Sequence, residues 1–569
     1  MGWVSGSQNM NNQGWGPSFG RGSMARQRQD LHVCEKTDSW SQGLPKGRPL
    51  HRVMRWGAVG LTGVMALILL MPMTSYSQEP ASPLQYGPFS TEQLSGSSEA
   101  FRVQALDVDS EGTRKTSFDA TPSVGADEVS PFSLTWEKRP NRSYLIPILE
   151  IPLYVFLLNQ FDRNFTEPEE EYRTTGHSIK ENITDGKWVV DNDQFSVNQF
   201  LHPYGGTVYF GLARSASLNF WESSLATATG SLIWELGGER TRPSINDQFT
   251  TTFGGIFLGE PLFRMANLLL ESDEEGEPGF WRELGAGIIS PPTAFNRFVF
   301  GNRFDAIYPS HKPATFMRLQ VGGTLTSGVN NVSSNVKTRG AIGDVTIRYG
   351  LPGKPGYSYS RPFDYFDFHF TAVSANAVES VNTHGLLIGR TYAASESTRG
   401  VWGLYGSYDY ISPQVFRVST SALSLGTTWQ SWLSKDVAVQ GTALGGAGYG
   451  AAGSIKRTGN RDYHYGFTPQ ALLALRLIMG DSAMIDFTAQ EFYVSGLLSS
   501  ESHGRENILR GNVSLTLRVV GRHGIALRYV ASQRNASYSD VDYHNQTVGT
   551  LSLMYVLLGS SGFGAVEWR

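Results

Sequence analysis

Apolar and polar residues alternate with a period of two across residues 312–569. In NVSLTLRV, at residues 512–519, every second residue is apolar and the residues between are polar. Successive side chains of a β-strand point to opposite faces, so each such segment has one apolar and one polar face. The segments are about ten or more residues long, as in membrane barrels, and Gly, Asn, Asp or Ser turns separate them.

This pattern predicts a mainly β fold with an α-helical N-terminal unit. Residues 312–569 are expected to form a transmembrane antiparallel β-barrel of about twelve strands, with the helices packed in or against its lumen. The strands are expected to begin near Phe316, Gly340, Phe363, Gly385, Gly400, Phe416, Val437, Phe467, Ala483, Leu509, Arg522 and Val548.

A soluble β-sandwich also alternates and is the main alternative. Its strands are usually about five or six residues long, which is shorter than the segments of this chain. Aromatic residues near the segment ends favour the barrel, because such rings gather where a membrane meets water. They are Trp402, Tyr408, Tyr410, Trp429, Trp432 and Tyr449. The mean hydropathy of −0.24 is compatible with a barrel, whose two faces average out.

Residues 1–77 are predicted to be an N-terminal extension and a secretory signal peptide. Residues 56–73 are almost wholly apolar, follow several basic residues and precede Ser75-Tyr76-Ser77, which fits cleavage before Gln78. An uncleaved signal anchor is the alternative. Residues 78–140 are rich in Ser, Pro, Gly, Asp and Glu and predict a disordered linker. We therefore expect export to the outer membrane of a Gram-negative bacterium, with outer-membrane lipid and the barrel-assembly machinery as partners.

The one cysteine, Cys34, lies before the predicted cleavage site. The exported chain would therefore have no disulfide and no thiol nucleophile. The net charge of −4 argues against nucleic acid as a partner. The sequence does not identify a protein partner other than the barrel-assembly machinery.

Residues 141–311 are predicted to form the helical unit. Residues 144–161 are apolar but contain Pro147, Glu150 and Pro152, which favours a helix on the membrane surface or against the barrel over a spanning one. Residues 204–229 predict one helix, and Ser244 with Asp247 predicts the start of another. Small residues along both should let these two helices pack closely.

The helical unit holds the densest group of unusual residues, including His202-Pro203-Tyr204-Gly205-Gly206, Trp221-Glu222-Ser223, Trp234-Glu235, Asn246-Asp247 and Gly259-Glu260. This pattern resembles a bacterial family, domain of unknown function 3943, whose members join such a segment to a predicted outer-membrane barrel. The resemblance covers roughly residues 188–270 and implies architecture without an assigned activity. The matched positions are His202, Arg214, Glu222, Glu235, Glu239, Asn246, Asp247 and Glu260.

Charged side chains among apolar residues need partners or a polar cavity, which leaves two hypotheses open. In the first, the protein is a structural, channel or envelope-interaction module, and the helical acids pair with arginines in the barrel lumen. The pairing residues would be Arg214, Glu260, Arg264, Arg318, Arg348, Arg390, Arg476, Arg518 and Arg528. In the second, it is a lipid- or cell-wall-modifying enzyme, with His202, Glu222, Glu235, Glu239 and Asp247 as catalytic candidates.

Other motifs give weaker signals. The unit lacks closely spaced His and carboxylate pairs, so neither a metal nor another cofactor is expected. Gly448, Gly450 and Gly453 match a nucleotide-binding spacing, but they lie in a β-rich region with no following helix. His369 and Thr371 share a strand face with Asp367, as in an acyl hydrolase, although threonine would replace serine there.

Overall fold

The computed structural model describes residues 141–165, 169–191, 193–271, 278–304, 310–330, 336–454, 463–496, 504–538 and 544–568. The predicted N-terminal extension, signal peptide and linker lie outside these residues.

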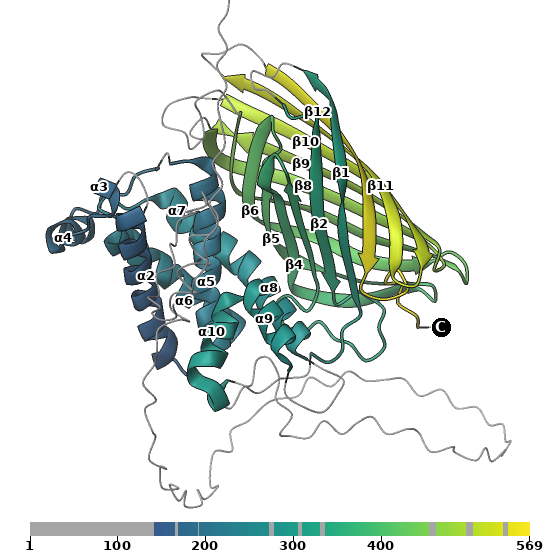
Figure 1. The fold of residues 1–569 in the computed structure, drawn as a ribbon, viewed down its shortest axis with the longest axis horizontal. Helices are drawn as coiled ribbons and strands as arrows, with labels where there is room; N and C mark the ends of the chain where they lie inside the picture. Colours follow the sequence, from purple (N-terminus) through teal and green to yellow (C-terminus); the bar gives the residue numbers. More distant parts are fainter. Residues whose placement is uncertain are drawn as a thin grey trace, which may run out of the picture. The chain divides into compact units, whose positions relative to one another are not determined.

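The C-terminal part of the chain forms a closed antiparallel barrel of twelve strands (Figure 1). Each strand pairs with its neighbours in sequence, and β1 pairs with β12, so the sheet has no free edge. The strands are β1 (Thr315–Asn330), β2 (Arg339–Tyr349), β3 (Phe366–Val373), β4 (Asn376–Ser395), β5 (Thr398–Ile411), β6 (Phe416–Trp432), β7 (Val437–Ser454), β8 (Tyr463–Met479), β9 (Ala483–Ser495), β10 (Gly504–Val520), β11 (His523–Tyr538) and β12 (His544–Leu558). The barrel and its strand number are confirmed, and every predicted start except that of β4 lies within five residues of the observed one.

Side chains on the strands alternate between the lumen and the outer surface. On β1, for example, Arg318 and Gln320 are buried, whereas Leu319 and Val321 are exposed. Strands β9 to β12 and β1 carry exposed apolar side chains on their outer surface, which we call the exposed apolar band. It comprises Met317, Leu319, Val321, Leu325, Phe487, Leu509, Val513, Leu515, Leu517, Ile525, Leu527, Tyr529, Leu551, Leu553 and Tyr555.

A β-bulge at Leu387 reverses this alternation within β4. Leu386 and Ile388 oppose consecutive residues of β5, so Leu387 is left out of the register. One extra residue turns all later side chains to the opposite face. Arg390 is therefore exposed on the outer surface, and the prediction that it lies in the lumen is wrong.

The two ends of the barrel differ. We call the end where β1 begins and β12 ends the terminal rim, and the opposite end the loop rim. At the terminal rim most connections are short, such as residues 521–522 between β10 and β11, but residues 350–365 between β2 and β3 form a longer one.

The helical unit precedes the barrel in sequence. Its elements are α2 (Leu145–Phe165), α3 (Glu169–Tyr172), α4 (Gly176–Thr184), the π-helical turn η1 (Val197–Leu201), α5 (His202–Ser215), α6 (Phe220–Ile233), the π-helical turn η2 (Trp234–Gly238), α7 (Ile245–Phe249), the π-helical turn η3 (Thr250–Gly254), α8 (Gly255–Leu270), α9 (Phe280–Ile289), α10 (Pro291–Phe300) and the 3₁₀ turn η4 (Gly301–Arg303).

The single helix predicted over residues 204–229 is two helices. Ser217, with φ at 72°, lies in the connection between α5 and α6. The Asn219 side chain accepts a hydrogen bond from the Glu222 backbone N–H, and the Glu222 carboxylate accepts one from the Asn219 N–H. This reciprocal capping box starts α6, and the Asn-x-x-Glu spacing was the sequence signal for it.

Close approach of α5 to α8 depends on glycine. A Cβ on Gly255 would lie 2.5 Å from the backbone carbon of Gly206, a distance that no side chain tolerates. A Cβ on Gly259 would similarly meet the ring of Phe210. The predicted small-residue contact between these helices is therefore present.

The helices pack on the outer face of the barrel rather than in its lumen, where they were expected. Helix α8 contacts β4 and β5, and the turn η3 contacts β5 and β6. The Thr383 hydroxyl, on the outer side of β4, donates to the carbonyl of Phe257 at 3.3 Å. Tyr408 and Tyr410, predicted to lie at a membrane interface, are instead covered, with 1% and 4% of their surfaces exposed.

The C-terminal segment after β12 closes the terminal rim from inside. The backbone N–H and carbonyl of Val566 bond the side-chain amide of Gln430, and Gln440 donates to the carbonyl of Gly564. Phe563 and Val566 are buried against lumen-facing apolar residues of the strands. The chain thus fills its own barrel at this end.

We predict that Phe563→Ala destabilises the barrel by about 3–5 kcal/mol, because it leaves a cavity in this packed layer. The urea midpoint of unfolding in detergent measures the effect. Leu433→Ala is the control, since Leu433 is 66% exposed and its removal should change the midpoint little. Equal midpoints for the two variants would contradict the packing of the tail.

Candidate functional site

A belt of ion pairs crosses the middle of the barrel lumen. Asp486 accepts from Arg318 and Arg476, each at 2.7 Å, and Arg348 Nε lies 2.9 Å from Asp367. Nearer the loop rim, Arg528 Nη1 lies 2.6 Å from Asp344 and Arg510 lies 3.5 Å from Glu379. The predicted lumen arginines Arg348, Arg476 and Arg528 therefore do face inward, but their partners are acids of the barrel.

A cavity of about 90 Å³ lies within this belt. Five arginines line it, with two carboxylates, two histidines and several neutral polar residues. Arg476 is fully buried, and no described protein group accepts a hydrogen bond from its Nη1 or Nη2 atoms. Its guanidinium stacks on the ring of Phe316, which holds it in place.

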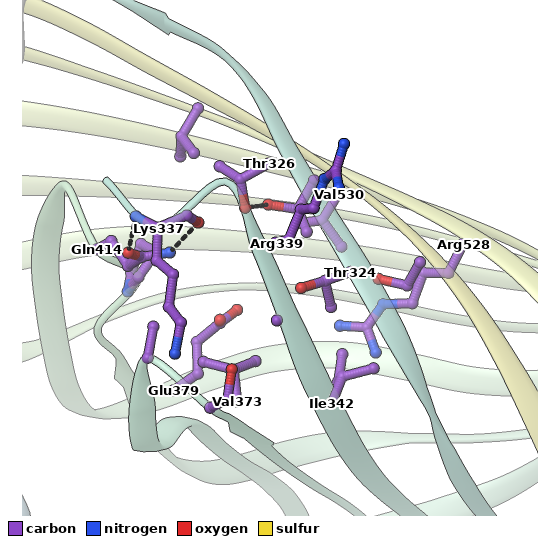
Figure 2. A pocket seen from close by; sticks show the side chains of 17 residues that line it. Thr324, Thr326, Lys337, Arg339, Ile342, Val373, Glu379, Gln414, Arg528 and Val530 are labelled. Atoms are coloured by element: carbon purple, nitrogen blue, oxygen red, sulfur yellow. Dashed lines mark hydrogen bonds between the residues drawn. The ribbon is translucent and has the colours of Figure 1, made fainter. Parts of the chain in front are cut away.

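A second cavity, of about 30 Å³, lies closer to the loop rim (Figure 2). Lys337, Arg339 and Arg528 line it together with Glu379. Arg528 also lines the first cavity, so the two cavities meet at this side chain. Cationic groups thus extend from the loop rim to the centre of the lumen.

An apolar cluster also crosses the lumen near the loop rim. It contains lumen-facing residues of β5, β6, β7, β9, β10 and β12, namely Ile411, Phe416, Val418, Ala452, Phe492, Val494, Ile508 and Val548, with Val415. Together with the C-terminal segment, this cluster places the larger cavity between two apolar layers of described residues.

The His369 and Thr371 pair does not have the geometry of a hydrolase triad. His369 Nε2 lies 2.6 Å from Asp344, and the Thr371 hydroxyl donates to the same carboxylate at 2.9 Å. A triad needs the acid and the nucleophile on different ring nitrogens, whereas both groups here approach Nε2. Asp367, the acid expected to join them, pairs with Arg348.

The ionic residues of the helical unit pair outside the lumen. The Arg214 guanidinium donates one hydrogen bond to each carboxylate oxygen of Glu260, and Arg264 Nε donates to Oε1 of the same carboxylate at 2.7 Å. Arg264 also bonds Asp364 at 3.1 Å and the carbonyl of Pro362, both in the connection between β2 and β3. The expected pairing of helical acids with lumen arginines therefore does not occur at Glu260.

Arg518 also differs from its predicted role. It contacts the backbone and carboxylate of Asp481, in the turn between β8 and β9 at the terminal rim. The Asp481 side chain is 69% exposed, so the pair contributes little stability.

Four of the five catalytic candidates gather at one end of the bundle. Glu239 interacts electrostatically with His202, Asp247 and Glu235. Burial raises the pKa of Glu239 to about 7, and the charge of His202 opposes this shift. His202 bonds Thr251 at 3.2 Å. Among the described residues, no three His, Cys, Asp or Glu side chains are arranged to hold a metal ion.

Glu222 lies apart from this group, at the opposite end of α6. It caps that helix, accepts from Tyr144 at 2.7 Å and pairs with Arg142. Its role is to fix the start of α6 next to the start of α2. The five candidates therefore do not form one site.

Outward-facing tyrosines of the barrel bind the helical unit. This contact was not predicted from the sequence. The Tyr408 hydroxyl donates to the carbonyl of Gln199, and Tyr465 accepts from Asn198 and Asn246 at 3.1 and 2.8 Å. The rings of Tyr449 and Tyr465 stack in parallel. Their position on the outer face was readable from the alternation, but their partners were not.

Comparisons with known proteins match the helical unit to a protein family and the barrel to solved structures. Residues 187–292 match the family described as Domain of unknown function (DUF3943). The match confirms the resemblance, and it covers the part of the helical unit that contacts the barrel. No curated protein matches the sequence.

Several solved barrels are similar in structure. An outer membrane channel from Pseudomonas putida F1 aligns with 43% of this chain and 96% of its own, at 9% identity and a TM-score of 0.22. The toluene transporter TodX of Pseudomonas putida aligns with 44% and 90%, at 8% identity and 0.17. The outer membrane protease OmpT of Escherichia coli aligns with 44% and 99%, at 8% identity and 0.16. Scores this low carry no argument about function.

We predict that Asp364→Asn destabilises the protein by about 3–5 kcal/mol, because it leaves the buried Arg264 without one of its two carboxylate partners. The urea midpoint of unfolding reports the loss. Asp481→Asn is the matched control, since it removes the solvent-exposed partner of Arg518 and should cost at most about 1 kcal/mol. Equal effects of the two substitutions would contradict a structural role for the buried ion pairs.

Proposed function

We propose that this protein is an outer-membrane barrel that binds the anionic group of a ligand inside an enclosed lumen. The observation that carries the proposal is Arg476, a fully buried guanidinium at the lining of the larger cavity whose two Nη atoms have no hydrogen-bond acceptor among the described residues.

The outer-membrane location is supported by the two faces of the wall. The exposed apolar band would cost free energy in water, whereas lipid chains would cover it. Behind it, the lumen buries arginines and aspartates that only a protein interior or water can satisfy. A closed sheet also leaves no strand edge without a paired neighbour, as a membrane requires.

The charge of the cavity favours an anion. Its lining contains Arg318, Arg348, Arg476, Arg510 and Arg528. Only Asp367 and Asp486 line the same cavity as carboxylates, although Asp344 and Glu379 lie close behind. Guanidinium groups match the planar or tetrahedral oxygens of carboxylates and phosphates, so these are the ligand classes that we propose.

The size of the cavity limits what can bind. A volume of about 90 Å³ suits a single carboxylate or phosphate group rather than a whole sugar or peptide. A larger ligand would therefore place only its anionic group there. The cationic residues at the second cavity support entry from the loop rim, since the C-terminal segment fills the terminal rim.

A permanently open channel is less well supported. Apolar layers cross the lumen at both rims, and the charged belt between them is tied by short ion pairs. Transport through this barrel would need one of these layers to move. Ligand binding needs passage past the loop-rim layer only, beside which the cationic second cavity lies.

We predict that Arg476→Gln weakens anion binding at least tenfold, because it removes a buried charge and its free donors. Isothermal titration of the purified protein in detergent, with inorganic phosphate and with decanoate, measures the effect and separates the two ligand classes. Arg390→Gln is the matched control, since this arginine lies on the outer surface and should leave the affinity unchanged.

The urea midpoint of both variants shows whether the barrel has remained folded. Binding that is unchanged in folded Arg476→Gln, or absent from the native protein for both anions, would contradict the proposal.

A further inference from the structure

Helix α6 has its polar face inside and its apolar face outside. Ser223, Thr227 and Ser231, at a spacing of four, are almost wholly buried. Trp221 and Leu225, on the opposite face, are 57% and 70% exposed. A helix in a water-soluble protein has the reverse arrangement, with its apolar stripe in the core.

Helix α2 is apolar on both faces, since it buries Ile151, Tyr154 and Val155 together with two polar side chains. Glu150 and Asn159 are buried against the other helices, where Asn159 donates to the carbonyls of Tyr172 and Gly238. Leu149 and Phe156, which face away, are 62% and 58% exposed. Among the described helices, α2 alone is long and apolar enough to cross a membrane by itself.

Charges in the middle of the bundle are buried rather than exposed. Arg214, Glu260 and Arg264 have no exposed surface and neutralise one another through the hydrogen bonds described above. Residues 144–161 contain one ionisable acid, Glu150, which is buried, and residues 223–234 contain none. The exposed faces of α2 and α6 over these residues are therefore free of charge.

The bundle runs the full height of the barrel wall. Near the loop rim, Asn198 and Asn246 bond Tyr465 at the start of β8. Near the terminal rim, Arg264 bonds Asp364. The 16 residues of α8 span about 24 Å, and the 21 of α2 about 31 Å, which matches an apolar band of about 25 Å in outer-membrane barrels.

From this geometry we infer that α2, α5, α6 and α8 cross the outer membrane as a bundle beside the barrel, with lipid acyl chains covering the outer faces of α2 and α6. In this arrangement α2 and α6 run from the terminal rim towards the loop rim, and α5 and α8 run back towards the terminal rim. Helices α9 and α10 then lead to β1. The exposed apolar band of the barrel and the exposed faces of the helices form two parts of one lipid-facing surface. This inference rests on the proposed outer-membrane location.

The single cysteine of the chain makes a direct test possible. In a Cys34→Ser background, Leu149→Cys and Leu225→Cys place a fluorescent label on the two helices, and the full-length protein is reconstituted into phosphatidylcholine vesicles. We expect nitroxides on the lipid acyl chains to quench both labels strongly, and aqueous iodide to quench them at least fivefold less than a label in water.

Two controls separate the inference from the location on which it rests. Leu515→Cys lies in the exposed apolar band of the barrel, and Lys187→Cys lies on an exposed polar segment between α4 and η1. Lipid quenching of Leu515→Cys together with iodide quenching of both helix labels would overturn the inference alone. Iodide quenching of Leu515→Cys as well would overturn the membrane location.

Discussion

Because successive side chains of a β-strand point to opposite sides, a one-layer barrel wall must present one set of residues to its lumen and the other to its surroundings. The fold therefore depends on what packs against the lumen-facing side chains and what packs against the outward-facing ones. The inward set is polar at mid-height and apolar at both rims, so the lumen packs like a core around a charged belt. The outward set is apolar on one side of the barrel and is covered by helices on the other.

The helices extend the same rule to a second layer. On α6 the polar groups face inward and the apolar groups face away, and α2 is apolar on both faces, so both helices expose apolar surface that a soluble bundle would bury. Arg264 joins the two layers, since it bonds Glu260 within α8 and Asp364 in the connection that leads into β3. The buried charges thus fix how the bundle sits on the wall, a role for which ion pairs are well suited even where they add little net stability.

The strands were predictable because their period is local, whereas contacts between distant residues were not. Most strand starts follow from alternation, but β4 begins nine residues before its predicted start, since a tight turn at 374–375 left no clear break in the pattern. Arg390 was misplaced because a bulge is invisible to a strict period of two. The partners of Arg214 and Glu260, the grouping of His202 with Glu239, and the return of the C-terminal segment into the lumen depend on packing that no single sequence reveals.

The enclosed lumen is the central claim of this account, and electrical recording tests it most directly. Purified protein would be inserted into a planar lipid bilayer in 1 M KCl, with insertion verified by recovery of the protein from the membrane. We predict no steady conductance above that of the bare bilayer, because apolar layers cross the lumen at both rims. A stable ohmic conductance proportional to the amount of inserted protein would contradict the account.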